Sequence, residues 1–272
     1  MIRVHSVRIA CTPVAGVPDD RGVSIAVRFR AALDDVREPD LADPELLPSR
    51  LARACARTLG VDGAGLSVST DGESRLPLGA SSPTAALAER LQFTAGDGPC
   101  ESAQRHQEPV FAASTDLRRR WPAFARLLAE HTPYRAVVAL PIGETLAGPG
   151  ALDLLFTDET TVPDLDVFEA MAVGDLACAA LGDAAVWAQW SPDGGPAWLH
   201  GPQARRRRLV WTAIGRVAMA RNASAPAALD LLRSAAQATG RTVDDLAGDL
   251  LAGRLDPADL RLAGSHPPDP RN

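Results

Sequence analysis

Arginines gather near the end of this chain, where they could bind phosphate groups. Residues 201–255 contain nine arginines and four aspartates, a net charge of +5, whereas residues 1–200 carry a net charge of −10. Arg205 to Arg208 are four consecutive arginines, and Arg216 follows two helical turns later. An acidic body with one basic end predicts an anionic partner for that end alone.

An apolar stripe in the same stretch predicts the helix that presents these arginines. Its residues recur at helical spacing and are Val210, Ala213, Ile214 and Val217. At about 100° per residue, the remaining surface carries Arg205, Arg208, Thr212, Gly215 and Arg216. We expect Arg205, Arg208 and Arg216 to form a basic stripe, and Arg206 to point toward the Val210 side.

Two further helices are predicted after the basic one. Ser224 suits the N-cap and Gly240 the end of the first, and Thr242 with Asp245 predicts a weak capping box for the second. Three helices with short connections predict a small antiparallel bundle. In such a bundle the turn that contains Arg241 lies at the same end as the start of the basic helix. Free N–H groups at helix N-termini favour phosphate there.

Residues 203–255 resemble an ANTAR domain, a three-helix module that binds RNA in transcription antitermination regulators. The resemblance rests on residues 213–217, 235–239 and 240–247, although the family often has Met where this chain has Ala218. It implies that two such domains bind RNA stem-loops, and so a homodimer. The implied RNA-binding residues are Arg205, Arg208, Thr212, Ala213, Gly215, Arg216, Arg241 and Thr242. The alternative is that Ala213 and Gly215 only allow close helix packing.

The body of the chain, residues 43–190, alternates helical and strand patterns. Strands are predicted over 64–70, 76–80, 109–113, 135–142 and 150–156, and helices over 46–59, 83–93, 117–131 and 164–189. This order predicts an α+β fold with an antiparallel sheet and helices, followed by the small all-α bundle. The carrying residues 66–68, 96–100, 121–124, 136–142 and 150–154 resemble those of a GAF domain, a small-molecule sensor fold. That resemblance implies a possible small-molecule ligand and identifies none.

The flanking segments are less regular in pattern. Residues 1–42 are predicted to be a partly ordered extension with a possible strand at 23–29, residues 191–202 a linker, and residues 256–272 a disordered tail. The helix after Pro163 has an apolar side, including Phe168, that suits its own sheet or the same helix of a second chain. The predicted homodimer would use this helix.

Residue sets for catalysis and metal binding are missing from the sequence. The cysteines, at 11, 55, 100 and 178, form no CxxC pair, the five histidines are scattered, and no HExxH, GxSxG, P-loop or GxGxxG occurs. We therefore expect no enzyme activity, no cofactor and no metal. Cys100 follows a Gly-Asp-Gly-Pro turn, for which a structural role is favoured over a redox one.

The sequence also bears on location and on the class of function. No apolar run of about 18 residues and no signal-peptide pattern occurs, which predicts a cytoplasmic protein with no membrane segment. The favoured interpretation is a regulator that senses a signal through its GAF-like region and binds RNA through its ANTAR-like region. One alternative is a DNA-binding regulator with the same sensor, because basic three-helix bundles also enter major grooves. The other is a small-molecule or redox sensor without nucleic-acid binding.

Overall fold

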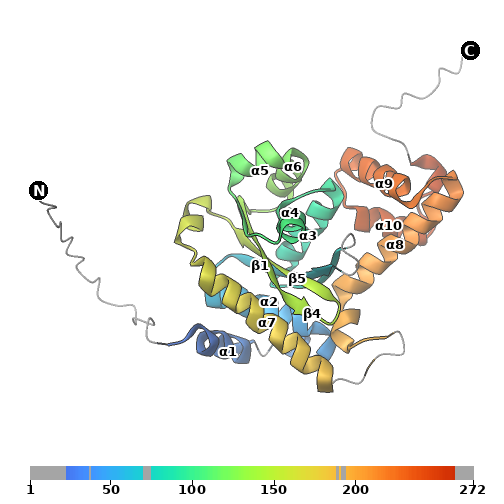
Figure 1. Ribbon diagram of the computed structural model, residues 1–272. Coiled ribbons are helices and arrows are strands. Elements are labelled where there is room, and N and C mark those ends of the chain that lie inside the picture. The colour runs from blue at the N-terminus through green and yellow to red at the C-terminus, as the bar shows by residue number, and fades with distance from the viewer. Residues whose placement is uncertain (1–22, 37, 70–74, 188–189, 191–193, 261–272) are drawn as a thin grey trace, which may run out of the picture.

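A five-stranded sheet lies at the centre of the described part of this computed structural model, which comprises residues 23–36, 38–69, 75–187, 190 and 194–260. Its strands are β1 (Gly63–Ser69), β2 (Arg75–Ala80), β3 (Val110–Ala112), β4 (Ala136–Thr145) and β5 (Gly148–Phe156), in the order β2-β1-β5-β4-β3. Every neighbouring pair is antiparallel. Helices cover both faces, and more helices lie beyond one edge (Figure 1). The predicted α+β fold with an antiparallel sheet is confirmed.

One face of the sheet carries the larger apolar core. It packs on α1 (Ile25–Asp35), α2 (Leu47–Leu59) and α7 (Val167–Trp187). Successive residues of a strand point to opposite faces, so β5 turns Leu152, Leu154 and Phe156 toward this layer. Among the described residues, α7 alone is long and apolar enough to cross a membrane by length and composition, and here it packs along β4.

The other face of the sheet mixes apolar and polar side chains. It packs on α3 (Pro83–Ala95), α4 (Pro99–His106), α5 (Ser114–Arg120) and α6 (Pro122–His131). From β5 this layer receives Ala151 and Leu155, with Asp153 between them. Asp153 and Ser67 are both buried. Polar groups that are buried in this way need partners.

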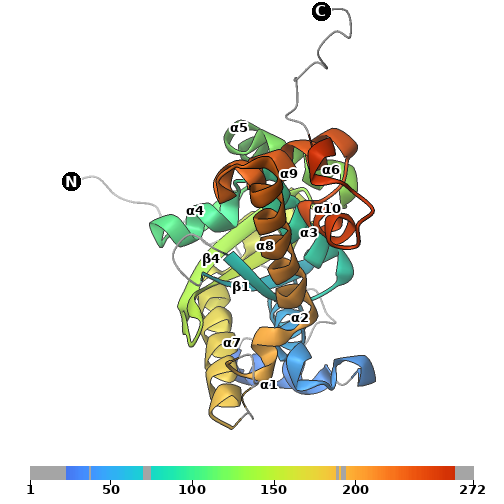
Figure 2. The ribbon, with the colours of Figure 1, turned by 90° about the vertical axis from the view of Figure 1, so that its right-hand side faces the viewer.

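The C-terminal helices pack on one another and on the body. They are α8 (Pro202–Arg221), α9 (Ala225–Thr239) and α10 (Val243–Leu251). Their shared core includes Val210 and Val217 of α8, Leu232 of α9 and Leu246 of α10. The predicted caps form: Ser224 accepts from Ala227, and Thr242 and Asp245 make a capping box. The group lies beside β2 and the end of α3, so it is joined to the body rather than separate from it (Figure 2).

Short 3-10 helices connect several of these elements. They are η2 (Pro39–Leu41), η3 (Pro44–Leu46), η4 (Glu159–Asp164), η5 (Ala197–His200) and η6 (Pro257–Asp259). The segment predicted as a linker includes η5, in which Trp198 is buried in the larger core. The segment predicted as a tail begins with η6, and Leu260 is buried in the core of the C-terminal helices. Residues 256–260 are therefore ordered, and this part of the tail prediction is wrong.

Two sequence predictions for single elements are wrong. Residues 23–29 were predicted as a strand, but helix α1 occupies them from Ile25 onward because Ile25, Phe29 and Leu33, four residues apart, all contact the core. The single helix predicted over 117–131 is divided at Trp121, because the residue before Pro122 avoids helical backbone angles. The predictions for residues 1–22, 191–193 and 261–272 lie outside the described residues.

Candidate functional site

The outer face of α8 carries most of the residues predicted to bind RNA. Five of the eight predicted residues are exposed there, namely Arg205, Arg208, Thr212, Gly215 and Arg216. A Cβ atom built on Gly215 would meet no atom within 4 Å, so the helix surface is open at this point. Gly215 therefore does not serve close packing.

The other predicted residues do not share this face. Ala213 is buried in the core of the C-terminal helices, and Thr242 is buried as the N-cap of α10. Arg241 is half-buried and forms an ion pair with Asp249 at 2.6 Å. The side chains of Ala213 and Thr242 are therefore not part of the outer face of α8, and the assignment of the eight residues to RNA stays a prediction.

The exposed arginines of α8 already have partners within the chain. Both terminal nitrogens of Arg205 bind the Glu45 carboxylate, at 3.1 and 2.6 Å. Arg208 lies 2.9 Å from Nδ1 of His200, and Arg216 donates to the Leu250 carbonyl at 2.8 Å. Exposed pairs of this kind contribute little to stability, roughly 0–1 kcal/mol. A phosphate group can therefore compete for these guanidinium groups.

Arg207 has the opposite environment, because its side chain is completely buried. Its Nη2 binds both oxygens of Glu89 on α3 at 3.1 Å, and its Nη1 donates to the Arg75 carbonyl at 3.4 Å. The guanidinium also lies over the ring of Phe93, 3.6 Å from the centroid, a cation–π geometry. Arg207, and not Arg206, is thus the arginine on the Val210 side.

This buried arginine links α8 to α3 and was not among the residues predicted from the sequence. Positions 207, 210, 214 and 217 are spaced by three, four and three residues, which is one helical face. The spacing could have identified Arg207 as an inward residue. Its charge instead suggested that it belonged with the exposed basic residues.

Asp244 at the start of α10 also faces this buried arginine. Its Oδ2 lies 3.9 Å from Nη2 of Arg207 and has no hydrogen-bond partner among the described residues. Burial raises the pKa of Asp244 to about 6, and the charge of Arg207 offsets only part of that rise. We call this contact between α3 and the C-terminal helices the junction. Two hydrogen bonds add to it: Val243 N donates to Thr94 Oγ1 at 3.0 Å, and Gln237 donates to the Thr94 carbonyl at 3.2 Å.

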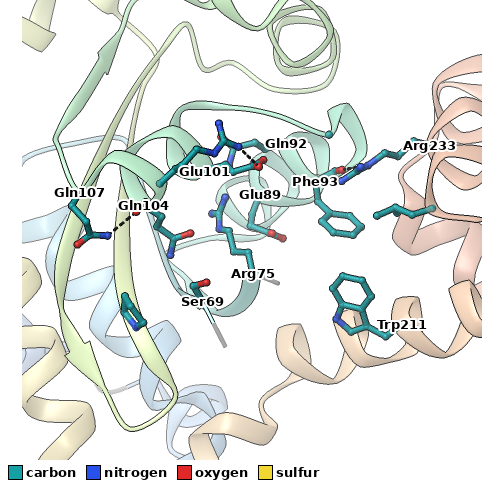
Figure 3. A pocket seen from close by; sticks show the side chains of 14 residues that line it. Ser69, Arg75, Glu89, Gln92, Phe93, Glu101, Gln104, Gln107, Trp211 and Arg233 are labelled. Carbon is teal, nitrogen blue, oxygen red and sulfur yellow. Dashed lines mark hydrogen bonds and ion pairs between the residues drawn. The ribbon is translucent and has the colours of Figure 1, made fainter. Parts of the chain in front are cut away.

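A cavity of about 460 Å³ opens beside this junction (Figure 3). Its lining residues from the body are Ser69, Arg75, Glu89, Gln92, Phe93, Gly96, Glu101, Gln104, Arg105, Gln107 and Pro149. The C-terminal helices add Trp211, Leu229 and Arg233. The volume falls within the usual range of small-molecule sites, roughly 300–1,000 Å³. The cavity is therefore a candidate ligand site that joins the body to the C-terminal helices.

A polar group on the sheet lies behind this cavity. Arg75 donates to Asp153 at 2.7 Å and to Ser67 at 3.0 Å. Burial raises the pKa of Asp153, and the Arg75 charge opposes that rise. Figure 3 shows Arg75 between Glu89 and Ser69 at the cavity wall. This arginine is thus held by two partners before any ligand arrives.

Cys100 lies beneath the same wall and is buried. The predicted loop over 96–100 is short, because Gly96 ends α3 with a φ of +89° and α4 begins at Pro99. The Cys100 sulfur lies 3.8 Å from the Ser67 hydroxyl, and burial raises the pKa of the thiol well above its usual value. A buried, protonated thiol is a poor nucleophile, which favours the structural role. Within the described residues, no group of three His, Cys, Asp or Glu residues could hold a metal ion.

Two solved GAF domains and a structure of SdiA are similar to this chain in fold. The GAF domain of a phosphoenolpyruvate-protein phosphotransferase from Coxiella burnetii has 16% identity and a TM-score of 0.37, covering 58% of this chain and 94% of that one. The A. aeolicus nlh2 GAF domain in an inactive state has 14% identity and a TM-score of 0.36, covering 57% and 96%. SdiA in complex with octanoyl-rac-glycerol has 13% identity and a TM-score of 0.42, covering 84% and 94%.

Comparisons by sequence add nothing to these similarities. No protein-family model matches the chain, and no curated protein matches it either. The structural similarities concern the fold alone. The ANTAR resemblance of residues 203–255 stays a prediction.

Proposed function

We propose that this protein is a cytoplasmic, non-catalytic regulator that senses a small molecule through a GAF-type body and binds RNA stem-loops through ANTAR-like C-terminal helices. The observation that carries the RNA half is the outer face of α8. There Arg205, Arg208 and Arg216 are exposed around the open surface of Gly215. The three arginines supply phosphate contacts, and the missing side chain at Gly215 lets a loop base or backbone approach closely.

The proposal includes a homodimer formed through α7. On this helix Phe168 is 82% exposed, Val186 73% and Trp187 87%. Large apolar side chains that remain exposed along one helix support an interface with a second copy. Two copies present two α8 faces, which suits a target that contains two stem-loops.

Hairpin affinity across a salt series tests the RNA half of the proposal. The RNA probe is a stem-loop taken from RNA that copurifies with the native protein. We expect Gly215→Leu to weaken binding by about tenfold or more without lowering Tm, because the site of the new side chain is open and leucine favours the helix more than glycine does. Arg208→Ala should weaken binding and lower the salt slope by about 1. Light scattering of the complex should show two chains.

The control is Arg126→Ala, which removes an exposed arginine of α6 that also has a carboxylate partner, Glu130. It should leave hairpin affinity and the salt slope unchanged. Tighter binding to duplex DNA than to the hairpin would replace the proposal with the DNA-binding alternative. If native protein binds neither, or if Gly215→Leu has no effect, the outer face of α8 is not an RNA site.

A further inference from the structure

The cavity beside the junction has walls from two parts of the fold. The ends of β1 and β2 with α3 and α4 form one side, and α8 and α9 form the other. Trp211 lines it from α8 and Arg233 from α9, whereas Gln104 lines it from α4, on the opposite side in Figure 3. A molecule in this space would contact the body and the C-terminal helices together.

Most charges that line the cavity are neutralised by a partner. Arg207 binds Glu89, Asp153 binds Arg75, and Arg105 binds Glu101. Each of these three pairs is net neutral, and the Asp244 carboxylate, which does not line the cavity, lies 3.9 Å from Arg207 on the far side of the first pair. The preference of the cavity for one sign of charge therefore depends on the charged group that remains.

Arg233 is the lining charge whose carboxylate partner is the most distant. Its Nε donates to the Phe93 carbonyl at 3.1 Å, while the nearest carboxylate, Asp230, is 4.0 Å from its Nη1. Its side chain is 24% exposed, and burial lowers the pKa of the guanidinium. A half-buried cation favours an anionic ligand group.

Apolar surface completes the cavity wall. Phe93 and Trp211 meet edge to face, with ring centroids 6.1 Å apart, and Figure 3 shows both rings beside the space. Leu229 and Pro149 add aliphatic surface. An ion without an apolar part would leave these groups in contact with water. The best match is therefore an ion that carries an apolar or aromatic body.

We propose that this cavity binds a small organic anion, whose charged group pairs with Arg233 and whose apolar body packs on Trp211 and Phe93. The proposal deepens the sensor half of the proposed function and rests on that half, without requiring RNA binding. Because the ligand contacts α8 and α9 as well as the body, its binding stabilises the docked arrangement of the C-terminal helices.

A titration of the full chain with phenyl phosphate, without RNA, tests the site. Two matched probes are used: inorganic phosphate, which lacks the ring, and benzyl alcohol, which lacks the charge. The readouts are the dissociation constant and the indole N–H resonance of Trp211, which is assigned with Trp211→Phe. We expect phenyl phosphate to shift this resonance and to bind about tenfold tighter than either matched probe.

Two variants separate the site from general effects on folding. Arg233→Gln should remove the preference for phenyl phosphate over benzyl alcohol. Gln104→Leu changes the opposite wall, on α4, and should leave the preference for phenyl phosphate over benzyl alcohol unchanged. The control Arg221→Gln changes an exposed arginine of α8 outside the cavity lining and should have no effect.

Several outcomes would overturn the proposal. They are no binding of phenyl phosphate below about 10 mM, equal binding of benzyl alcohol, or an unchanged preference in Arg233→Gln. Because RNA is absent, none of these outcomes bears on the outer face of α8. A failure of hairpin binding, in turn, would leave this anion site standing.

Discussion

The two interfaces that hold this fold together differ in chemistry. Between the sheet and the helices α2 and α7, the packing consists of apolar side chains such as Leu51, Leu152 and Val173. Between α3 and the C-terminal helices, buried Arg207 lies beside the carboxylates of Glu89 and Asp244, and the pKa of Asp244 is raised. Apolar packing is insensitive to pH, whereas a charged junction depends on every partner being present and correctly protonated. The apolar interface should therefore stay closed over a wide range of conditions, whereas the charged junction should open or close when a charge is gained or lost.

Among the changes considered, removal of the buried Arg207 side chain should destabilise the charged junction most. Arg207→Met leaves Glu89 and Asp244 without their cation, and breaking a buried ion pair costs about 3–5 kcal/mol. Hydrogen exchange should show α8, α9 and α10 opening more easily while the amides of β1, β4 and β5 stay protected. Adding Glu89→Gln should restore part of the loss, because one of the two unpaired charges is then gone.

The neighbouring arginine provides the control for this prediction. Arg206→Met alters an exposed side chain of the same helix and should change stability by less than about 0.5 kcal/mol. Equal effects of the two substitutions would mean that the buried pair does not hold the junction.

A substitution at the apolar interface should cause the next largest loss of stability, and its effect on hydrogen exchange should reach different parts of the fold. A Cβ atom on Gly79 of β2 would lie 2.3 Å from the Pro48 carbonyl carbon and 2.4 Å from Ser49 N, both backbone atoms of α2. Gly79→Ala should therefore cost about 1–3 kcal/mol in the free energy of unfolding, measured by denaturant titration. Loss of protection should reach the whole sheet.

Gly65→Ala on β1 is the matched control for that clash. A Cβ atom there meets nothing within 4 Å, so the variant should be at least as stable as the parent. If Gly65→Ala destabilises the protein as much as Gly79→Ala, the loss comes from replacing a glycine in this sheet and not from the contact of residue 79 with α2.

The smallest predicted effect is a pH dependence of the charged junction. The folded-state pKa of Asp244 is about 6 against an ordinary value of 3.8, so the folded protein binds the proton more tightly. The resulting stabilisation is fully present below pH 3.8 and is lost as pH rises through 6. Between pH 7.5 and 5 the folded state should gain about 1.4 kcal/mol from this group.

Comparison with Asp244→Asn isolates this contribution from other titrating groups. The amide resembles the protonated acid, so the variant should lack this part of the pH dependence. The charged groups that act on Asp244 are Arg207, Glu89, Arg90 and Arg206, and all are retained in the variant. If wild type and variant respond identically between pH 7.5 and 5, Asp244 does not titrate in this range.

The sequence predicts those parts of the molecule that depend on local periodicity. The five strands follow from alternating or continuous apolar runs, and the inward stripe of α8 at Val210, Ile214 and Val217 follows from helical spacing. The caps at Ser224 and Thr242 follow from residue type. A short alternating run at 23–29 was ambiguous, because its side chains also fit one face of a helix.

Parts that depend on distant residues could not be predicted in this way. Whether an arginine in a run of four is buried depends on Glu89, which lies 118 positions away from Arg207. The cavity depends on β1, β2, α3, α4, α8 and α9 meeting at one place. Neither arrangement leaves a motif in a single segment.

The course of α8 has a mechanical consequence. Its start, at Ala204, belongs to the core beneath the sheet, and its later turns belong to the core of the C-terminal helices. One unbroken rod thus runs from one core into the other, roughly 25 Å from Ala204 to Arg221. A tilt of about 5° around the buried end would carry the far end by about 2 Å. The helix can therefore act as a lever that pivots at Ala204. A ligand in the cavity at Trp211 would push on this lever between the pivot and its far end at Arg221.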